Sequence, residues 1–157
     1  MASVCTYELA RLSDAESIAN LSRWLIEAGL QPTWTSARVT WHIRHPESVV
    51  LLARESGRRL IGFAIMQFGE SSAHLNLLGV LPARQRHGIG RHLLRWLETT
   101  AMDAGIFLVK LEVRATNMNA RKFYESLGYR ELDVVSGYYE GQEDAIRMRR
   151  DLGVLVR

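Results

Sequence analysis

The residues of this chain that are best suited to chemistry begin in one run, Val80-Leu81-Pro82-Ala83-Arg84-Gln85-Arg86-His87-Gly88-Ile89-Gly90-Arg91. The run leaves an apolar segment and opens a segment with helical periodicity. Gly88 and Gly90 lack a Cβ, so the backbone can approach a ligand closely, and the first-turn N–H groups of a helix have no partner inside it. An anion completes those groups and offsets the three cations that crowd the same turn, Arg86, His87 and Arg91. The sequence therefore predicts a turn that holds a pyrophosphate.

Two common phosphate-binding motifs do not fit this run. It is not the Gly-x-Gly-x-x-Gly of dinucleotide-binding folds, and the chain contains no Gly-x-x-x-x-Gly-Lys-Ser/Thr loop. The pattern Gln85-x-x-Gly88-x-Gly90 instead resembles the acyl-CoA signature of the GCN5-related N-acetyltransferases (GNAT). Downstream, Asn117-x-x-Ala120-x-x-Phe123-Tyr124-x-x-x-Gly128-Tyr129 resembles the second signature of that superfamily, in the expected order.

The resemblance implies acetyl-CoA as co-substrate and no metal. It assigns cofactor binding to the strand end, the turn and the second signature, at Leu78, Gly79, Val80, Arg86, His87, Gly88, Ile89, Gly90, Arg91 and Asn117. Asn117 is also suited to capping a helix, and one residue can serve both purposes. The metal-like spacing His42-x-x-His45 has no third ligand nearby.

Attack of an amine on a thioester needs a group that takes the amine's proton, a stabilised oxyanion and a proton for the departing thiolate. Tyr124 is a phenol on the predicted helix of the second signature, and its spacing alone is typical of a core aromatic residue. The family resemblance favours a catalytic role, because the tyrosine of the Phe-Tyr pair resembles a general acid near the CoA sulfur. We therefore predict that Tyr124 is the proton donor.

The candidates for the base are Glu112, His74 and, with less support, Glu70. Lys110, Glu112 and Arg114 alternate with apolar residues, so a charged ladder on one sheet face is an equally good interpretation. Yet Glu112 lies midway along a strand just before the second signature, where a water could relay a proton to it. His74 has a near-neutral intrinsic pKa and lies where many relatives place a glutamate. This departure weakens the histone-type interpretation and favours Glu112, with His74 left as the alternative.

The acceptor is predicted from a closer resemblance. Residues 111–129 and the later stretch 137–148 are similar to the N-terminal protein acetyltransferases that modify a ribosomal-protein alanine (RimI-like), and this likeness covers about the last 85 residues. In that subfamily the glutamate of Glu-Val-Arg resembles the proton acceptor, which maps to Glu112, and the tandem tyrosines resemble part of the peptide-binding wall, which maps to Tyr138 and Tyr139. The first 70 residues match loosely, and the resemblance implies that Trp34 lies in a loop that in this superfamily tends to line the acceptor site.

The predicted function is thus direct acetyl transfer to a protein or peptide N-terminal α-amino group. Such a group has a pKa near 7.7–8.0 and lysine one near 10.4, so its deprotonation at neutral pH is easier by about 3.5 kcal/mol. A distant, water-relayed Glu112 suits the easier proton. Two alternatives stay open: transfer to a small amine such as an aminoglycoside, polyamine or amino acid, and a CoA-sensing module without turnover.

Composition favours one enzyme domain spanning residues 1–157. The chain is 47% hydrophobic, which suffices for one core, and its net charge of +3 suits an acidic ligand without the lopsided charge of a nucleic-acid binder. Cys5 is the only cysteine, which favours a reducing compartment. The amino terminus has neither a basic start nor an apolar stretch, and no run of about eighteen apolar residues occurs, so we expect a cytoplasmic protein without membrane contact.

The elements that position these residues follow from hydrophobic periodicity and from turn residues. We expect an α/β fold with a mixed central sheet of about six to seven strands flanked by about four helices. The predicted strands are 7–11, 49–54, 60–68, 73–80, 107–113, 129–135 and 145–151. The predicted helices follow Ser13-Asp14 as far as Gly29, span 39–45, run from Ile89 to a stop at Gly105, and run from Asn117 or Asn119 to Gly128. Trp24, Trp41 and Trp96 are expected to be packing residues.

Overall fold

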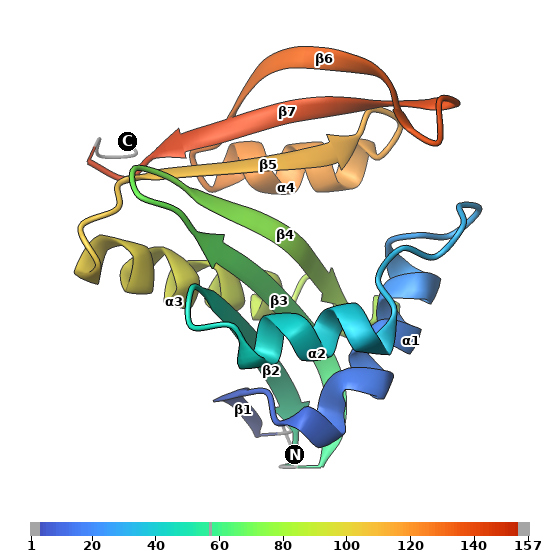
Figure 1. Cartoon of the computed structure of the whole chain (residues 1–157), viewed down its shortest axis with the longest axis vertical. Coiled ribbons are helices and arrows are strands. Elements are labelled where there is room, and N and C mark those ends of the chain that lie inside the picture. Colours follow the sequence, from blue (N-terminus) through green and yellow to red (C-terminus); the bar gives the residue numbers. More distant parts are fainter. Residues whose placement is uncertain (1–3, 57, 154–157) are drawn as a thin grey trace.

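The computed structural model describes residues 4–56 and 58–153. Within them, seven strands form one mixed sheet in the order β1-β2-β3-β4-β5-β7-β6 (Figure 1). Their bounds are β1 Cys5–Leu9, β2 Ser48–Glu55, β3 Arg59–Phe68, β4 Ala73–Val80, β5 Leu108–Arg114, β6 Arg130–Tyr139 and β7 Glu143–Asp151. Every neighbouring pair in this sheet is antiparallel except β4 and β5.

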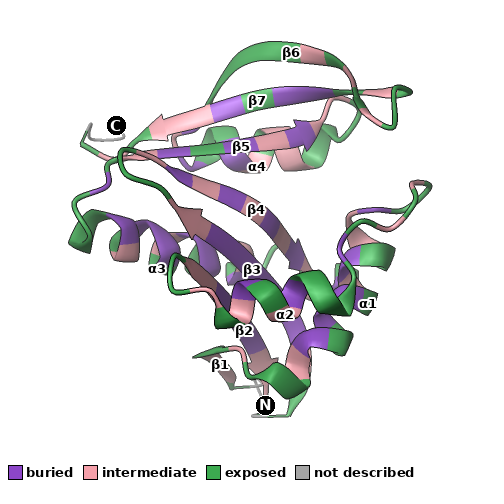
Figure 2. Ribbon diagram, in the orientation of Figure 1, coloured by how far each residue is buried: buried purple, intermediate pink, exposed green. Residues whose placement is uncertain are grey.

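Four α-helices in the described residues cover the two faces of the sheet: α1 Ala15–Leu25, α2 Ser36–Arg44, α3 Ile89–Asp103 and α4 Met118–Ser126. The sheet divides the core into two clusters, because successive residues of a strand point to opposite faces. Leu52 and Phe63 pack with α1 and α2, whereas Leu51 and Met66 pack with α3 and α4. The central strands are accordingly buried on both sides, and the helices expose their outer faces (Figure 2). None of the helices in the described ranges is long and apolar enough to cross a membrane.

Local signals explain where the helices that flank the site begin and end. The Asn117 side chain accepts a hydrogen bond from the Ala120 N–H at 3.1 Å, which confirms Asn117 as the cap of α4. Thr35 caps α2 in the same way, with 3.2 Å to the Arg38 N–H, so α2 begins earlier than its apolar pattern predicted. Gly105 follows α3 with a φ of +79°, as a helix stop requires.

The end of α1 differs from the prediction. The helix ends at Leu25, and Gly29 belongs to the following loop with a φ of +81°. The buried side chain of Glu27 accounts for the difference, because its carboxylate accepts hydrogen bonds from the Thr33 N–H at 2.6 Å and from the Trp34 N–H at 3.1 Å. These bonds fold residues 26–35 into an ordered loop in place of another helical turn.

The sheet opens between β4 and β5. Their ladder contains only the pairs Ala73–Val109 and His74–Lys110, after which the two strands diverge (Figure 1). On its other side β4 follows β3 with a register shift, since Ile65 faces Leu77 whereas Met66 faces Leu75. Asn76 is the extra residue of this β-bulge, and a bulge bends the strand that contains it. The bend turns β4 away from β5 and opens the site described below.

The predicted order of strands and helices is confirmed, and most boundaries agree within about two residues. β1 lies two residues before its predicted position, and β6 is longer than predicted because it continues into the hairpin with β7. The expectation for three tryptophans was wrong: Trp24, Trp41 and Trp96 are 63%, 47% and 37% exposed. They occupy outer helix positions, where the apolar stripe that faces the sheet is already complete.

Candidate active site

A cleft with a volume of about 930 Å³ occupies the opening between β4 and β5. The open edge of β4, the turn before α3, the strand β5 and the helix α4 form its walls. Of the residues predicted to bind the cofactor, those that line the cleft are Leu78, Gly79, Val80, Arg86, Gly88, Ile89, Gly90, Arg91 and Asn117. His87 is exposed and does not line it, so the structure gives no support to its predicted place.

The turn before α3 adopts the backbone that an anion site needs. Gly88 is the N-cap residue with a φ of +81°, and Arg86 has a φ of +65°, which is uncommon for a residue with a Cβ. In the described residues no side chain caps α3. The N–H groups of its first turn, which borders the cleft, therefore lack a capping partner. The Gln85 amide closes the turn by donating to the Val80 carbonyl oxygen at 3.0 Å.

The two glycines of this turn serve different purposes. A Cβ on Gly88 would meet nothing within 4 Å, so the left-handed backbone, not lack of space, calls for glycine there. A Cβ on Gly90 would lie 3.2 Å from Cζ of Phe123, so Gly90 lets α3 pack closely against α4. The glycine pattern therefore reflects the shape of the turn and the packing of its helix.

The arginines of the cleft differ in their pairing. Arg84 is bound by the Glu55 carboxylate, which neutralises its charge. Arg86 and Arg91 form no ion pair with any residue of the described ranges, and both are exposed at the turn. Their charges are available to an anion that binds the N-terminus of α3.

Tyr124 lies on α4 with its side chain in the wall of the cleft. The residue is 8% exposed, and its ring makes edge contacts with Phe123 and Tyr129 at centroid distances of 5.2 and 5.8 Å. Burial, together with the neighbouring Tyr139, raises the pKa of Tyr124 well above its usual value, so the phenol keeps its proton. No group of the described residues hydrogen-bonds to this hydroxyl, which leaves it free to donate to a ligand.

The structure brings the two alternative bases together. His74 Nε2 lies 2.5 Å from Oε2 of Glu112, across the point where β4 and β5 part. Glu112 lines the cleft and its side chain is 21% exposed, whereas His74 lies behind it, outside the cleft lining, and is 40% exposed. The carboxylate therefore has the cleft on one side and an imidazole that reaches solvent on the other.

The charged-ladder interpretation of β5 also has support at Glu112, because Glu112 lies opposite Arg147 in the β5–β7 pairing, and the pKa of that arginine is raised by its hydrogen bond with Asp133 and also by the Glu112 charge. Lys110 is exposed, and Arg147, the cross-strand neighbour of Glu112, is bound by Asp133 at 2.7 Å.

Glu70 is exposed in the turn after β3 and does not line the cleft, so its position does not support a role as the base.

The predicted acceptor residues do not all lie together. Tyr139 lines the cleft, and burial raises its pKa to about 12. Tyr138 lies beside it with a ring centroid distance of 4.9 Å, but it is 48% exposed and outside the cleft lining. Trp34 is 7% exposed and packs in the core under α2, so the indole itself is not a wall of the cleft.

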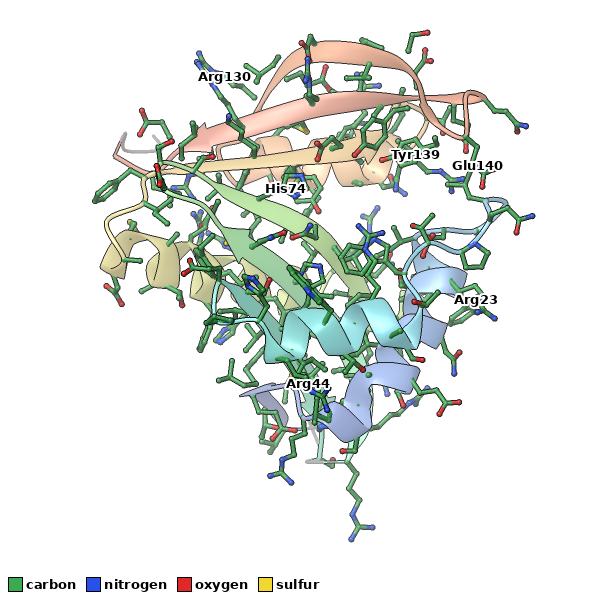
Figure 3. All side chains as sticks on the ribbon, viewed as in Figure 1. Arg23, Arg44, His74, Arg130, Tyr139 and Glu140 are labelled. Carbon is green, nitrogen blue, oxygen red and sulfur yellow. The ribbon has the colours of Figure 1, made fainter. Side chains whose placement is uncertain are left out.

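Sequence reasoning missed the residues that close the far end of the cleft. Arg114 donates to Glu143 at 2.6 Å and to the Ala28 carbonyl oxygen at 2.8 Å, which ties the loop 26–35 to β7. The Gln31 N–H donates to Glu140 at 2.5 Å, so the turn of the β6–β7 hairpin touches the same loop. Figure 3 shows Tyr139 and Glu140 on the hairpin side of the opening, with His74 near its closed end. These are contacts between segments far apart in sequence, and no local pattern indicates them.

One further residue was missed, and the sequence did contain a signal for it. Asn76 lines the cleft from the bulge of β4, and its Oδ1 is buried without a hydrogen-bond partner in the described residues. It is the only amide in an otherwise apolar stretch of that strand. A buried acceptor without a partner is costly, so it indicates a donor supplied by a ligand.

Comparison with known proteins agrees with this geometry. The model of the Acetyltransferase (GNAT) family matches residues 13–129. N-alpha-acetyltransferase RimI of Mycobacterium tuberculosis is 35% identical over 146 residues, which cover 90% of this chain and 89% of that protein. The ribosomal protein bS18-alanine N-acetyltransferase of Salmonella typhimurium is 42% identical over 93 residues, covering 57% of this chain and 63% of that protein, so the match spans less than two thirds of its length.

The fold is shared with a solved enzyme. The crystal structure of the ribosomal-protein-S18-alanine N-acetyltransferase from Escherichia coli superposes with a TM-score of 0.81 at 28% identity, covering 98% of this chain and 97% of that one. The opened sheet, the glycine turn at the N-terminus of α3 and the matched family model over residues 13–129 lead to one conclusion: the chain belongs to the Acetyltransferase (GNAT) family.

Proposed function

We propose that this protein is an acetyl-CoA-dependent N-acetyltransferase that transfers the acetyl group directly to the α-amino group of a protein or peptide N-terminus. One observation carries the proposal: the Glu112 carboxylate and the Tyr124 phenol line the same cleft, which the anion-binding turn of α3 also lines. A proton acceptor, a proton donor and a phosphate site in one cleft are what acetyl transfer from CoA requires.

The cleft fits acetyl-CoA in two respects. The uncapped N-terminus of α3, with the exposed cations Arg86 and Arg91, suits the pyrophosphate. Beyond His74 the edge of β4 has no strand partner on the β5 side within residues 4–56 and 58–153, so its N–H and C=O groups suit the amides of an extended pantetheine arm, as a strand edge suits an added strand. When bound there, acetyl-CoA supplies an activated thioester carbonyl for the amine.

The proposed catalytic groups act at opposite ends of the transfer. Glu112 takes a proton from the incoming ammonium, directly or through a water, and His74 holds the carboxylate in place on its solvent side. Tyr124 donates its proton to the departing sulfur, a role that its raised pKa allows because the phenol remains protonated throughout the working pH range. No covalent relay is needed, and Cys5 lies in β1, away from the residues of the cleft.

The acceptor is proposed from the end of the cleft that lies next to the β6–β7 hairpin. The Gln31–Glu140 contact joins the loop 26–35 to the β6–β7 hairpin, which favours an acceptor that enters end-on, as a chain terminus does. Tyr138 and Tyr139 are the proposed wall for that terminus. The Mycobacterium and Salmonella relatives are named for acetylation of N-terminal α-amines and of an alanine, which supports the same acceptor class. A cytoplasmic location belongs to the same proposal and is supported by the single cysteine, Cys5.

The test is acetyl-CoA-dependent thiol release with three sets of acceptors. They are peptides with a free N-terminal alanine, the same peptides blocked at the N-terminus and carrying a lysine, and small amines such as spermidine and an aminoglycoside. Turnover with the free α-amine peptides is the expected result. Turnover confined to the small amines contradicts the proposed acceptor, and tight CoA binding without any turnover contradicts the proposed enzyme.

A further inference from the structure

Arg38 is an exposed arginine on the first turn of α2, and it is held in one orientation by its surroundings. Its guanidinium carbon lies 3.8 Å from the ring centroid of Trp34, a stacking distance. Trp34 is itself 7% exposed and packed in the core, so the platform under the arginine is rigid. Stacking uses the flat face of a guanidinium and leaves the N–H groups at its edge available.

No carboxylate of the described residues pairs with this guanidinium. Within the described residues the guanidinium makes one hydrogen bond, from Nη1 to the Thr33 carbonyl oxygen at 3.5 Å, which is weak. The acidic groups of the neighbouring hairpin are already engaged: Glu140 by the Gln31 N–H at 2.5 Å, and Glu143 by Arg114 at 2.6 Å. Arg38 therefore has unused capacity to bind a carboxylate, which its fork of N–H groups can hold with two hydrogen bonds.

Arg38 is connected to the proposed acceptor end of the cleft through the loop 26–35. Its guanidinium contacts Trp34 and Thr33 of that loop, and the Gln31 N–H of the same loop donates to Glu140, the residue next to Tyr139. The Arg38 charge also acts on Tyr138, because it opposes the rise in the pKa of that phenol that burial and the Glu112 charge cause. Tyr138 also contacts the ring of Tyr139, which lines the cleft. Two charges thus act on Tyr138: that of Glu112, in the wall of the cleft, and that of Arg38, on the exposed side of α2.

An acceptor peptide that starts at Glu112 in the cleft and leaves it past the tyrosine pair runs toward Arg38. With the α-amine beside Glu112, an extended chain advances about 3.3 Å per residue. Its second and third side chains then pass Tyr138 and come within reach of the long arginine side chain. We propose that Arg38 is a specificity-determining residue that binds an acidic side chain at the second or third position of the acceptor, so that the preferred substrates are N-termini with Asp or Glu there. This inference rests on the proposed function.

The experiment compares peptides that differ only at those positions: Ala-Asp-Ala, Ala-Asn-Ala and Ala-Lys-Ala at the N-terminus of one common sequence, and the same set with the variable residue third. The measured quantity is the ratio of kcat/KM for the Asp peptide to that for the Asn peptide, at low salt. We expect a ratio of about five to ten in the wild-type protein, in line with a partly exposed charge-assisted pair, and a lower rate still for the Lys peptide. The ratio should fall as salt is raised, since exposed charges are screened.

Three variants isolate the contribution of the guanidinium. Arg38→Gln should bring the ratio close to one, and Arg38→Lys should keep part of it, because the charge remains but the fork is lost. Arg44→Gln is the matched control: Arg44 is exposed on the last turn of the same helix, and Figure 3 shows it on the side of the molecule away from Tyr139 and Glu140. It should keep the wild-type ratio. Circular dichroism and thermal unfolding check that each variant is folded.

The possible outcomes separate this inference from the function on which it rests. Turnover of all peptides with an Asp/Asn ratio near one in the wild-type protein contradicts the role of Arg38, while the proposed function stands. A wild-type preference for Asp that survives in Arg38→Gln contradicts it equally. Absence of turnover with every free α-amine peptide contradicts the proposed function, and the acceptor preference is then refuted with it.

Discussion

Replacement of Tyr124 by Phe removes one oxygen atom from the cleft wall and little else. The ring keeps its edge contacts with Phe123 and Tyr129, and the lost hydroxyl has no hydrogen-bond partner among the described residues. Folding stability should therefore change by less than about 0.5 kcal/mol, since no buried partner is left unsatisfied.

The effect on rate should be much larger. If proton donation to the sulfur limits turnover, loss of the donor lowers kcat by about 10²–10⁴-fold. This corresponds to about 2.7–5.4 kcal/mol in the activation barrier. The assay is steady-state thiol release with a free N-terminal alanine peptide, combined with calorimetric titration of CoA to show that the cofactor still binds.

Tyr129→Phe is the matched control, because the neighbouring tyrosine has the opposite surroundings. Its hydroxyl donates to the buried carboxylate of Glu98 at 2.8 Å, and Glu98 is also bound by Arg150 at 2.8 Å. Loss of that hydroxyl should lower the free energy of unfolding by about 1–2 kcal/mol and no more, because the Glu98 carboxylate is still paired with Arg150. It should leave kcat within about threefold of the wild type.

The two variants thus have opposite expected profiles: a slow but stable Tyr124→Phe and an active but less stable Tyr129→Phe. A Tyr124→Phe protein with wild-type kcat would refute the assigned proton donor. Equal losses of rate in both variants would show that general disturbance of the aromatic cluster, and not proton donation, is responsible.

Three other changes test separate parts of the site. Glu112→Gln should lower kcat about 100-fold or more with unchanged CoA affinity, and His74→Gln should lower kcat less. The measurement is steady-state kinetics. If both variants keep the wild-type kcat, Glu112 is not the base. Gly90→Val brings side-chain atoms against Phe123, since even a Cβ there lies 3.2 Å from its ring, so CoA affinity measured by calorimetry should fall about tenfold. Burial lowers the pKa of His42 from 6.5 to about 4, so the unfolded chain takes up this proton at a higher pH than the folded protein. The free energy of unfolding is therefore unaffected by this group above pH 6.5 and decreases as the pH falls from 6.5 toward 4. Urea unfolding should show a loss of at most about 3 kcal/mol over that range, and a His42→Asn variant with an equally steep loss would contradict this assignment.

Much of the fold could be predicted because its signals are local. The helical periodicity of α3 and its stop at Gly105 depend only on nearby positions. The cap at Asn117 is likewise decided by the helix that follows it, and the structure confirms it. The family signatures are local runs as well, which is why the comparisons bear them out.

The parts of the site that escaped prediction depend on distant segments. His74 and Glu112 are 38 positions apart, and only the short β4–β5 ladder and the bulge at Asn76 bring their side chains together. Sequence reasoning treated them as competing bases because it could not see this contact. The burial of Trp34 was missed although its cause lies close in sequence, because the hydrogen bonds that Glu27 makes to the loop before α2 leave no periodic pattern.

The two-pair ladder between β4 and β5 also bears on how folding and ligand binding are coupled. In the described residues, only the pairs Ala73–Val109 and His74–Lys110 join the four strands from β1 to β4 to the three strands β5, β7 and β6. The sheet therefore consists of a four-strand part and a three-strand part with an open edge between them. A co-substrate that lies along β4 occupies the gap between the two parts as an added strand would. Part of its binding free energy then stabilises the association of the two parts of the sheet. By mass action, a ligand at about 100 times its Kd adds about 2.7 kcal/mol to the free energy of unfolding. Backbone amide exchange in β4 and β5 should slow accordingly when CoA is present, which makes the substrate a structural member of the sheet during each catalytic cycle.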